Sequence, residues 1–337
     1  EMCIRDRLSG FVNGVLRNIA RNIDSVQFDT LSIRYSMPQW IVDRFVAEYG
    51  EKKAEEIFKA FHNKSTISIR TNLTRCTPDE LRAMLEAEGV TVTAVDELNY
   101  AFVISGFDYL NGLQSFRDGL FYVQDISSML VAQTAAPKKG DYVIDVCAAP
   151  GGKSTHIAEL LQGSGHVLAR DLTDNKVDMI EENIERHGLN NMSAEVWDAT
   201  VPDADSAGKA DILICDLPCS GLGVLGRKKD IRYKMTPESV DELVVLQRQI
   251  LDTVHTYVKP NGVLVYSTCT IDEAENEDNV RWFIEKHPEF ELDKNFAEGT
   301  GMKQILPGEH GSDGFFIARF IKSKLCCLLY TSPSPRD

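Results

Sequence analysis

The chain has 337 residues, of which 43% are apolar, and its formal net charge is −15 at pH 7. This length and composition predict a globular protein with room for two domains and well-formed cores. The chain has neither an apolar run of about 20 residues, as a membrane span needs, nor an opening signal segment, so we expect a cytoplasmic monomer without a membrane partner. The eight cysteines lack metal-ligand or disulfide spacing, which predicts free thiols and no metal. The strong negative charge argues against a surface covered in phosphate contacts.

The two ends of the chain fit no periodic pattern. We therefore set residues 1–7 and 325–337 aside as expected non-native segments. The second segment contains the adjacent Cys326 and Cys327, and it resembles translated sequencing-adapter sequence. Between them, residues 11–20 predict a helix within the stretch 8–30.

Residues 31–122 predict a small module of mixed helix and strand. Residues 38–60 indicate helices, and residues 67–72 and 95–105 carry strand-like alternation. Residues 77–88 predict a helix, because a threonine cap is followed by a proline at the first helical position.

The most informative stretch is an apolar strand, residues 143–146, that enters a turn at residues 147–153 and then an amphipathic helix at residues 154–161. Gly151 and Gly152 let the backbone pass close to a ligand at the start of the helix. A strand, turn and helix of this kind predict a site for a nucleotide-type cofactor.

One candidate ligand for this turn is the phosphate chain of a nucleoside triphosphate. Gly152, Lys153 and Ser154 supply the second half of a P-loop, and residues 212–216 imitate the strand and aspartate that hold magnesium. However, Cys147 stands where the first glycine belongs, and the alanines and proline that follow make a stiff turn rather than a ring of free amides. A P-loop NTPase is therefore the alternative hypothesis for the function of this chain.

The other candidate is S-adenosylmethionine, and aspartates after successive strands support it. Asp171 follows a strand at residues 166–169, about twenty residues past the glycines, where a carboxylate can accept from the ribose hydroxyls. Asp198 follows the next strand and is placed to accept from the adenine amino group, and Asp216 follows the fourth. Because the carboxyl ends of parallel strands open onto one crevice, we expect Asp145 to converge with these three.

Two loop cysteines, Cys219 and Cys269, follow the fourth and fifth strands, so both thiols should open onto the same crevice. A thiolate near a methyl donor suits methylation of a pyrimidine at C5, because thiolate addition at C6 makes C5 nucleophilic. Asp216 is expected to stabilise the adduct by hydrogen bonding to the cytosine ring. We interpret Cys147 and Cys215 as small apolar core residues.

Two charged runs remain. Five basic residues occur within residues 227–234, directly after the Cys219 loop, and could bind RNA phosphates, although a solvated surface loop is the alternative. The candidates are Arg227, Lys228, Lys229, Arg232 and Lys234. The acidic run 272–278 is expected to begin a helix and to stabilise its positive end.

The sequence resembles the Sun-type (Sun/Fmu) RNA cytosine-C5 methyltransferases, most closely the bacterial members that modify 16S ribosomal RNA. The resemblance spans nearly the whole chain, and its motifs are residues 31–40, 68–72, 145–153, 216–221, 223–234, 267–270 and 307–316. It implies a Rossmann-like class I S-adenosylmethionine-dependent methyltransferase fold with a mostly parallel sheet in residues 123–324. It also implies a small RNA-recognition-like subdomain within residues 31–122 and a remnant of a helical RNA-binding domain in residues 8–30.

The resemblance also assigns roles to residues. It implies that Cys269 is the nucleophile, that Cys219 assists product release, and that the target is cytosine 967 in rRNA numbering. The implied cofactor contacts are Cys147, Ala148, Ala149, Pro150, Gly151, Gly152, Lys153, Asp171, Asp198 and Asp216. A third hypothesis is a non-catalytic RNA-binding module that retains the fold.

Overall fold

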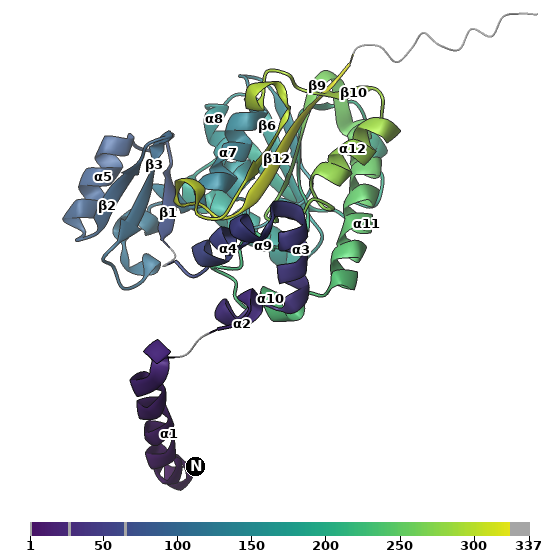
Figure 1. Ribbon diagram of the computed structural model, residues 1–337. Coiled ribbons are helices and arrows are strands. Elements are labelled where there is room, and N and C mark those ends of the chain that lie inside the picture. The colour runs from purple at the N-terminus through teal and green to yellow at the C-terminus, as the bar shows by residue number, and fades with distance from the viewer. Residues whose placement is uncertain (1, 26–27, 64–65, 324–337) are drawn as a thin grey trace, which may run out of the picture. The chain divides into compact units, whose positions relative to one another are not determined.

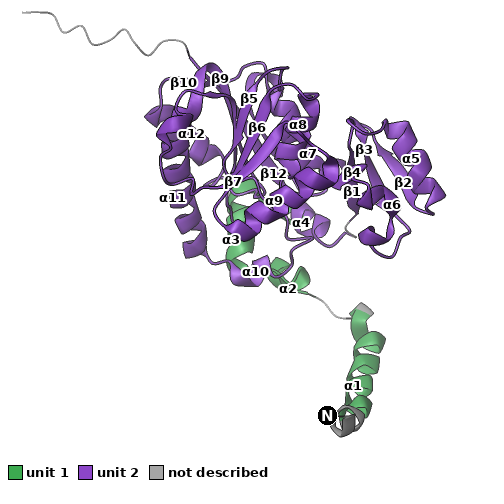
Figure 2. Cartoon of the chain, turned by 180° about the vertical axis from the view of Figure 1, so that it is seen from behind, with its two compact units in different colours: residues 1–55 green, residues 56–337 purple. Residues whose placement is uncertain are grey.

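The structure is a computed structural model, and it describes residues 2–25, 28–63 and 66–323. The segment 325–337, with Cys326 and Cys327, lies outside the described residues. The chain forms two compact units, residues 1–55 and residues 56–337 (Figure 2).

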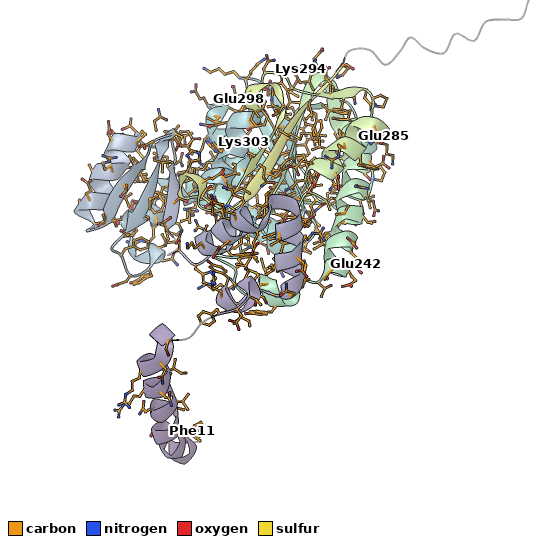
Figure 3. The ribbon with its side chains drawn as sticks, in the orientation of Figure 1. Phe11, Glu242, Glu285, Lys294, Glu298 and Lys303 are labelled. Atoms are coloured by element: carbon orange, nitrogen blue, oxygen red, sulfur yellow. The ribbon has the colours of Figure 1, made fainter. Side chains whose placement is uncertain are left out.

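The first unit is helical. Its elements are α1 (Met2–Asn22), the 3-10 turn η1 (Ile23–Ser25), α2 (Leu31–Arg34), α3 (Gln39–Tyr49) and the start of α4 (Glu51–Ala60). The helices predicted for residues 11–20 and 38–60 are therefore confirmed. Helix α1 also includes residues 2–7, so the missing periodic pattern there did not mean a missing helix. Phe11 projects from α1 and is 70% exposed (Figure 3).

The second unit begins with a small antiparallel sheet in the order β2-β3-β1-β4. Its elements are β1 (Ile67–Thr71), α5 (Pro78–Ala87), β2 (Thr91–Val95), β3 (Leu98–Ser105), η2 (Leu110–Gly112), α6 (Gln114–Arg117) and β4 (Phe121–Val123). Thr77 caps α5 as predicted, because its side chain accepts from the Glu80 amide while Glu80 bonds back to Thr77. Leu81 and Leu85 of α5 pack on Ile69 and Phe102 of the sheet.

The larger sheet has the order β10-β12-β9-β8-β5-β6-β7, with β11 paired to β12. Its strands are β5 (Tyr142–Asp145), β6 (His166–Asp171), β7 (Met192–Val196), β8 (Ala210–Asp216), β9 (Val258–Thr268), β10 (Phe290–Leu292), β11 (Met302–Ile305) and β12 (Phe315–Lys322). Strands β5 to β9 pair in parallel, whereas β10, β11 and β12 pair antiparallel. The predicted mostly parallel α/β fold and its strands are confirmed.

Helices cover both faces of this sheet (Figure 1). They are α7 (Ile126–Ala135), α8 (Gly152–Leu160), α9 (Asp174–His187), α11 (Pro237–Val254) and α12 (Glu277–Lys286). The short helix α10 (Ile231–Lys234) lies in the connection between β8 and α11, and short 3-10 turns occur at η3 (Ala204–Ser206), η4 (His255–Tyr257), η5 (Ala297–Gly299) and η6 (Glu309–Gly311). Successive side chains of a strand point to opposite faces, so Ile212 and Ile214 of β8 pack with α7 and α8, while Leu213 and Cys215 pack with α11 and α12.

The outer surfaces of α11 and α12 are polar, and Glu242 and Glu285 point away from the sheet (Figure 3). Helix α12 begins at Glu277 rather than at the start of the acidic run. The prediction that residues 272–278 begin a helix is therefore wrong for its first half, because Asp272, Glu275 and Asn276 are fully buried in the preceding turn. Among the described helices, none is long and apolar enough to cross a membrane.

Candidate active site

Asp171 and Asp216 lie at the carboxyl ends of their parallel strands, as predicted from the sequence. Strand β5 lies between β6 and β8, so chain connections leave it in opposite directions, which is where open α/β sheets bind ligands. In the pairing register, Asp216 of β8 lies opposite Ser267 of β9, and Asp171 of β6 lies opposite Val196 of β7. The loops that follow these strands therefore share one edge of the sheet.

The turn after β5 is fixed by its own backbone amides. The Ala148 amide donates to the Arg170 carbonyl at 2.8 Å, the Ala149 amide to Asp171 Oδ2 at 2.9 Å, and the Gly151 amide to the Ala148 carbonyl at 2.7 Å. Gly151 has φ of +101°, a conformation that suits glycine. Because these three amides already have protein acceptors, the turn does not form the ring of free amides that a triphosphate needs.

Asp171 is a buried acid attached to this turn. Its Oδ1 accepts from the Leu172 amide and from Lys176 Nζ, both at 2.8 Å, while its Oδ2 accepts from Ala149. The side chain of Lys176 is 49% exposed and that of Asp171 is 5% exposed. The half-exposed lysine therefore occupies one of the acceptor positions of this carboxylate.

Asp198 and Asp145 differ from each other in their surroundings. Asp198 is exposed, and its Oδ1 accepts from the Thr200 amide at 2.9 Å and from the Thr200 hydroxyl at 2.7 Å, which lowers the pKa of Asp198. Asp145 is fully buried and accepts from the Ser154 hydroxyl, and burial raises its pKa to about 7. The expectation that Asp145 opens onto the crevice is therefore wrong, because α8 begins directly over its carboxylate.

Lys153 and Asp216 form an ion pair beside the thiols. Lys153 Nζ lies 2.7 Å from Asp216 Oδ2, and the Ser267 hydroxyl donates to Asp216 Oδ1 at 2.7 Å. The Lys153 ammonium also lies 5.5 Å from the centre of the Phe315 ring. Burial alone would lower the pKa of Lys153, but Asp216 outweighs burial and the pKa is raised. The ion pair with Asp216 thus fixes the Lys153 ammonium at this end of the sheet.

Cys219 and Cys269 meet although 50 residues separate them: their sulfur atoms lie 3.3 Å apart. The pKa of Cys269 is lowered, chiefly by its hydrogen bond with Cys219, and the positive charges of Lys153 and Lys228 act in the same direction against burial and Asp216. The same hydrogen bond and burial raise the pKa of Cys219. These two directions favour Cys269 over Cys219 as the thiolate of the pair.

The remaining two cysteines near this edge are held as neutral thiols. Cys215 is fully buried and belongs to the core cluster between the sheet and α11, and Cys147 packs against the same cluster. Burial raises the pKa of both thiols. This agrees with the interpretation of Cys147 and Cys215 as core residues.

The basic run divides into buried and exposed residues. Arg227 donates to the Thr66 carbonyl at 2.9 Å and forms ion pairs with Asp125 at 2.9 Å and Asp313 at 2.6 Å. Arg232 is 5% exposed and donates to the Leu225 carbonyl. The expectation that Arg232 binds phosphate is wrong, because its side chain is buried within the protein. The Arg227 side chain is 30% exposed, so its contact with phosphate stays a prediction.

The lysines of the run differ from its arginines. Lys228, Lys229 and Lys234 are exposed, with Lys234 in an ion pair with Asp230 at 2.7 Å. Lys228 is close enough to Cys269 for its charge to act on the thiol. These three lysines therefore remain candidates for contacts with a polyanion.

Two buried charged residues near the site were missed by the sequence analysis. Arg70 of β1 is 1% exposed, and it binds Glu159 of α8 at 2.8 Å and the Gly152 carbonyl at 2.8 Å. It therefore connects the small sheet directly to the turn after β5. Glu275 lies in the turn before α12 and binds Ser220. A charged residue inside a predicted strand was the available signal for Arg70, whereas Glu275 was hidden in the acidic run.

The sheet order, the strand-end acids and the turn after β5 define a Rossmann-like class I methyltransferase fold. Residues 132–321 match the family described as 16S rRNA methyltransferase RsmB/F, and residues 37–107 match the ferredoxin-like domain of RsmF/B-like methyltransferases. The chain therefore belongs to the RsmB/F family, and the resemblance to the Sun-type enzymes is confirmed at this level.

Individual relatives agree with this assignment. A probable ribosomal RNA small subunit methyltransferase B of Bacillus subtilis is 38% identical over 94% of this chain and 74% of its own length. Its counterpart in Synechocystis is 33% identical over 94% of this chain and 75% of its own length. The crystal structure of PH0851 is 30% identical, with a TM-score of 0.82 over 95% of this chain and 75% of its own. The structure of NSun6 from Pyrococcus horikoshii with SFG, 24% identical, shares the fold with a TM-score of 0.76 over 86% of this chain and 99% of its own.

Proposed function

We propose that this chain is an S-adenosylmethionine-dependent RNA cytosine-C5 methyltransferase that acts on small-subunit (16S) ribosomal RNA. Cytosine 967 in rRNA numbering is the target implied by the resemblance to the Sun-type enzymes. The observation that carries the proposal is the pair of hydrogen-bonded thiols 3.3 Å apart at the ends of adjacent parallel strands, in which the pKa of Cys269 is lowered. A non-catalytic RNA-binding module would have no use for this pair.

The residues present fit S-adenosylmethionine. Asp171 is held at the end of β6 by two backbone amides and by Lys176, and the half-exposed lysine side chain can swing away without moving the backbone. A carboxylate has about four lone-pair sites, so Asp171 can keep the Ala149 amide and still accept from ribose hydroxyls. Asp198 remains exposed for the adenine amino group. The cofactor loop, residues 147–153, lies between these acids and Asp216.

The chain's own residues support the covalent chemistry in order. The Cys269 thiolate adds to C6 of the cytosine, and the electron pair of the C5–C6 double bond moves toward C4 and N3, which makes C5 nucleophilic. S-adenosylmethionine supplies an electrophilic methyl group for C5. Asp216, already bound by Lys153 and Ser267, has lone pairs left to accept from the exocyclic amine. A base then takes the C5 proton, the C5–H electron pair restores the C5–C6 double bond, and the Cys269 thiolate leaves from C6, a release that Cys219 assists.

The RNA contacts are proposed for the exposed lysines of the basic run and for the small antiparallel sheet. Although the net charge of the chain is −15, the exposed Lys228, Lys229 and Lys234 supply local positive charge to which RNA phosphates can bind. The cytosine must leave any base stack to reach the thiolate, which favours loops and single strands over duplexes.

The test compares Cys269→Ala with Cys219→Ala on a fragment of 16S ribosomal RNA. Cys269→Ala should abolish turnover and any covalent adduct, because the bond to C6 cannot form. Cys219→Ala should still attack and methylate but release poorly, so a denaturation-resistant RNA complex should accumulate on a gel. Cys76→Ala, a partly buried thiol of the small sheet, is the matched control and should behave as wild type.

Two further measurements separate the alternatives. Calorimetry should show binding of S-adenosylmethionine and none of ATP, whereas ATP binding alone would favour the NTPase. Mass spectrometry should find 5-methylcytosine in treated RNA, and unmodified RNA would favour the non-catalytic module. An adduct with Cys269→Ala and none with Cys219→Ala would reverse the roles of the thiols.

A further inference from the structure

Glu275 is a fully buried acid that holds the backbone of the Cys219 loop. Its Oε1 accepts from the Ser220 amide and from Gln247 Nε2, both at 2.9 Å, and its Oε2 accepts from the Ser220 hydroxyl. All three contacts come from donors, as an ionised carboxylate requires, because it can only accept. Burial raises the pKa of Glu275, and the hydrogen bonds from Ser220 and Gln247 oppose this rise by stabilising the ionised form. Glu275 therefore clamps the residue next to Cys219.

The same network reaches both sides of Cys219 and one side of Cys269. Gln247 Nε2 donates to the Pro218 carbonyl at 2.8 Å, so the residues before and after Cys219 are both fixed. The Ser220 hydroxyl lies 2.9 Å from that of Thr270, which follows Cys269. The distance between the two sulfur atoms is thereby set by a buried polar network rather than by loop packing alone.

Glu275 also acts on the two thiols unequally. Its negative charge is among the causes that raise the pKa of Cys219, after the hydrogen bond to Cys269 and burial. Cys269 instead faces the charges of Asp216, Lys153 and Lys228. A buried negative charge on one side of the pair disfavours a thiolate on that side, and the proton consequently stays on Cys219.

We propose that Glu275 is the positioning residue that divides the work of the two thiols, by holding the Cys219 loop and keeping the shared proton on Cys219, so that Cys269 is the nucleophile. This inference rests on the proposed function in assigning the attack to Cys269. Glu275 is not a catalytic residue, because it contacts neither thiol and acts through Ser220.

The experiment measures thiol reactivity without RNA or cofactor. Wild type, Glu275→Gln and Glu273→Gln are alkylated with iodoacetamide from neutral to alkaline pH, and peptide mass spectrometry reports Cys219 and Cys269 separately. Glu273 is the matched control, since it is exposed and pairs with Arg281 at 2.9 Å. Groups facing the thiols, namely Asp216, Lys153 and Lys228, are unchanged in every variant, as are Asp272 and Tyr266 beside Glu275.

Wild type and Glu273→Gln should alkylate Cys269 well before Cys219. In Glu275→Gln the ratio of Cys269 to Cys219 alkylation at neutral pH should fall severalfold, and the alkylation midpoint of Cys269 should move to higher pH. A ratio and midpoint equal to those of Glu273→Gln would overturn the proposal.

Ser220→Ala is the second variant if Glu275→Gln does not fold. It keeps the backbone contact but removes the hydroxyl that joins Glu275 to Thr270, so it should shift the ratio in the same direction by a smaller factor. An unchanged ratio in folded Ser220→Ala would also overturn the proposal. Failure of wild type to form 5-methylcytosine while the thiol bias persists would instead refute the proposed function.

Discussion

Replacing Arg70 by methionine should destabilise the protein far more than an ordinary surface change. The side chains of Arg70 and Glu159 are each 1% exposed, and Arg70 Nη2 lies 2.8 Å from Glu159 Oε1. Arg70 also donates to the Gly152 carbonyl at 2.8 Å and to the Thr155 hydroxyl at 3.1 Å. Methionine retains most of the apolar stem but none of the donors, so the variant leaves Glu159 buried without its cation.

The size of the loss follows from this burial. Removing one partner of a buried ion pair costs about 3–5 kcal/mol, because an uncompensated charge remains. His187 cannot replace the cation at neutral pH: although its Nδ1 lies 3.4 Å from Glu159, burial lowers the pKa of His187. The matched control is Arg281→Met, where the arginine side chain is 58% exposed and its loss should cost about 0–1 kcal/mol.

Urea unfolding monitored by circular dichroism measures both variants and the double variant Arg70→Met with Glu159→Met. The double variant should recover much of the lost stability, because replacing both partners by apolar side chains removes the buried charge. Affinity for S-adenosylmethionine should fall in both Arg70 variants, since the contact to the cofactor loop at Gly152 is gone. The reasoning fails if Arg70→Met is no less stable than Arg281→Met, or if the double variant is no more stable than Arg70→Met.

Three further predictions concern the cofactor, the RNA and pH. Asp171→Ala should weaken S-adenosylmethionine binding by about 1.5–3 kcal/mol in calorimetry, which is the scale of hydrogen bonds to a charged group. The exposed control Asp174→Ala should bind as wild type. Equal affinities of Asp171→Ala and wild type would show that Asp171 does not bind the cofactor. A plot of the logarithm of the RNA binding constant against the logarithm of salt concentration should have a slope whose magnitude falls by roughly 1–2 when Lys228 and Lys229 are changed to glutamine. An unchanged slope would show that these lysines do not contact phosphate. Asp145 has a folded-state pKa raised from 3.8 to about 7, so its contribution to stability is present at low pH and is lost as pH rises through that window. Urea titrations should therefore show Asp145→Asn gaining stability relative to wild type between those two pH values, and a constant difference would contradict the assignment.

Local pattern was sufficient to predict most of the elements. The parallel strands are short apolar runs, each closed by a turn, and their acids occur where the strands end, so Asp171, Asp198 and Asp216 could be placed from sequence. The start of α5 was equally readable, because a threonine cap and a proline act within one turn of helix. The pairing of Cys219 and Cys269 in one crevice also followed once both were assigned to strand ends of the same sheet.

Burial and long-range contacts were decided by the tertiary structure alone. Arg232 looked like its exposed lysine neighbours, and Glu275 looked like the exposed Glu273, because charge in a sequence does not reveal which face of a loop meets the protein. The proposed division of Cys219 and Cys269 into proton carrier and thiolate also depends on the tertiary structure. It depends on a sulfur separation of 3.3 Å and on a glutamate from another loop, both of which are set by strand order and packing across residues distant in sequence.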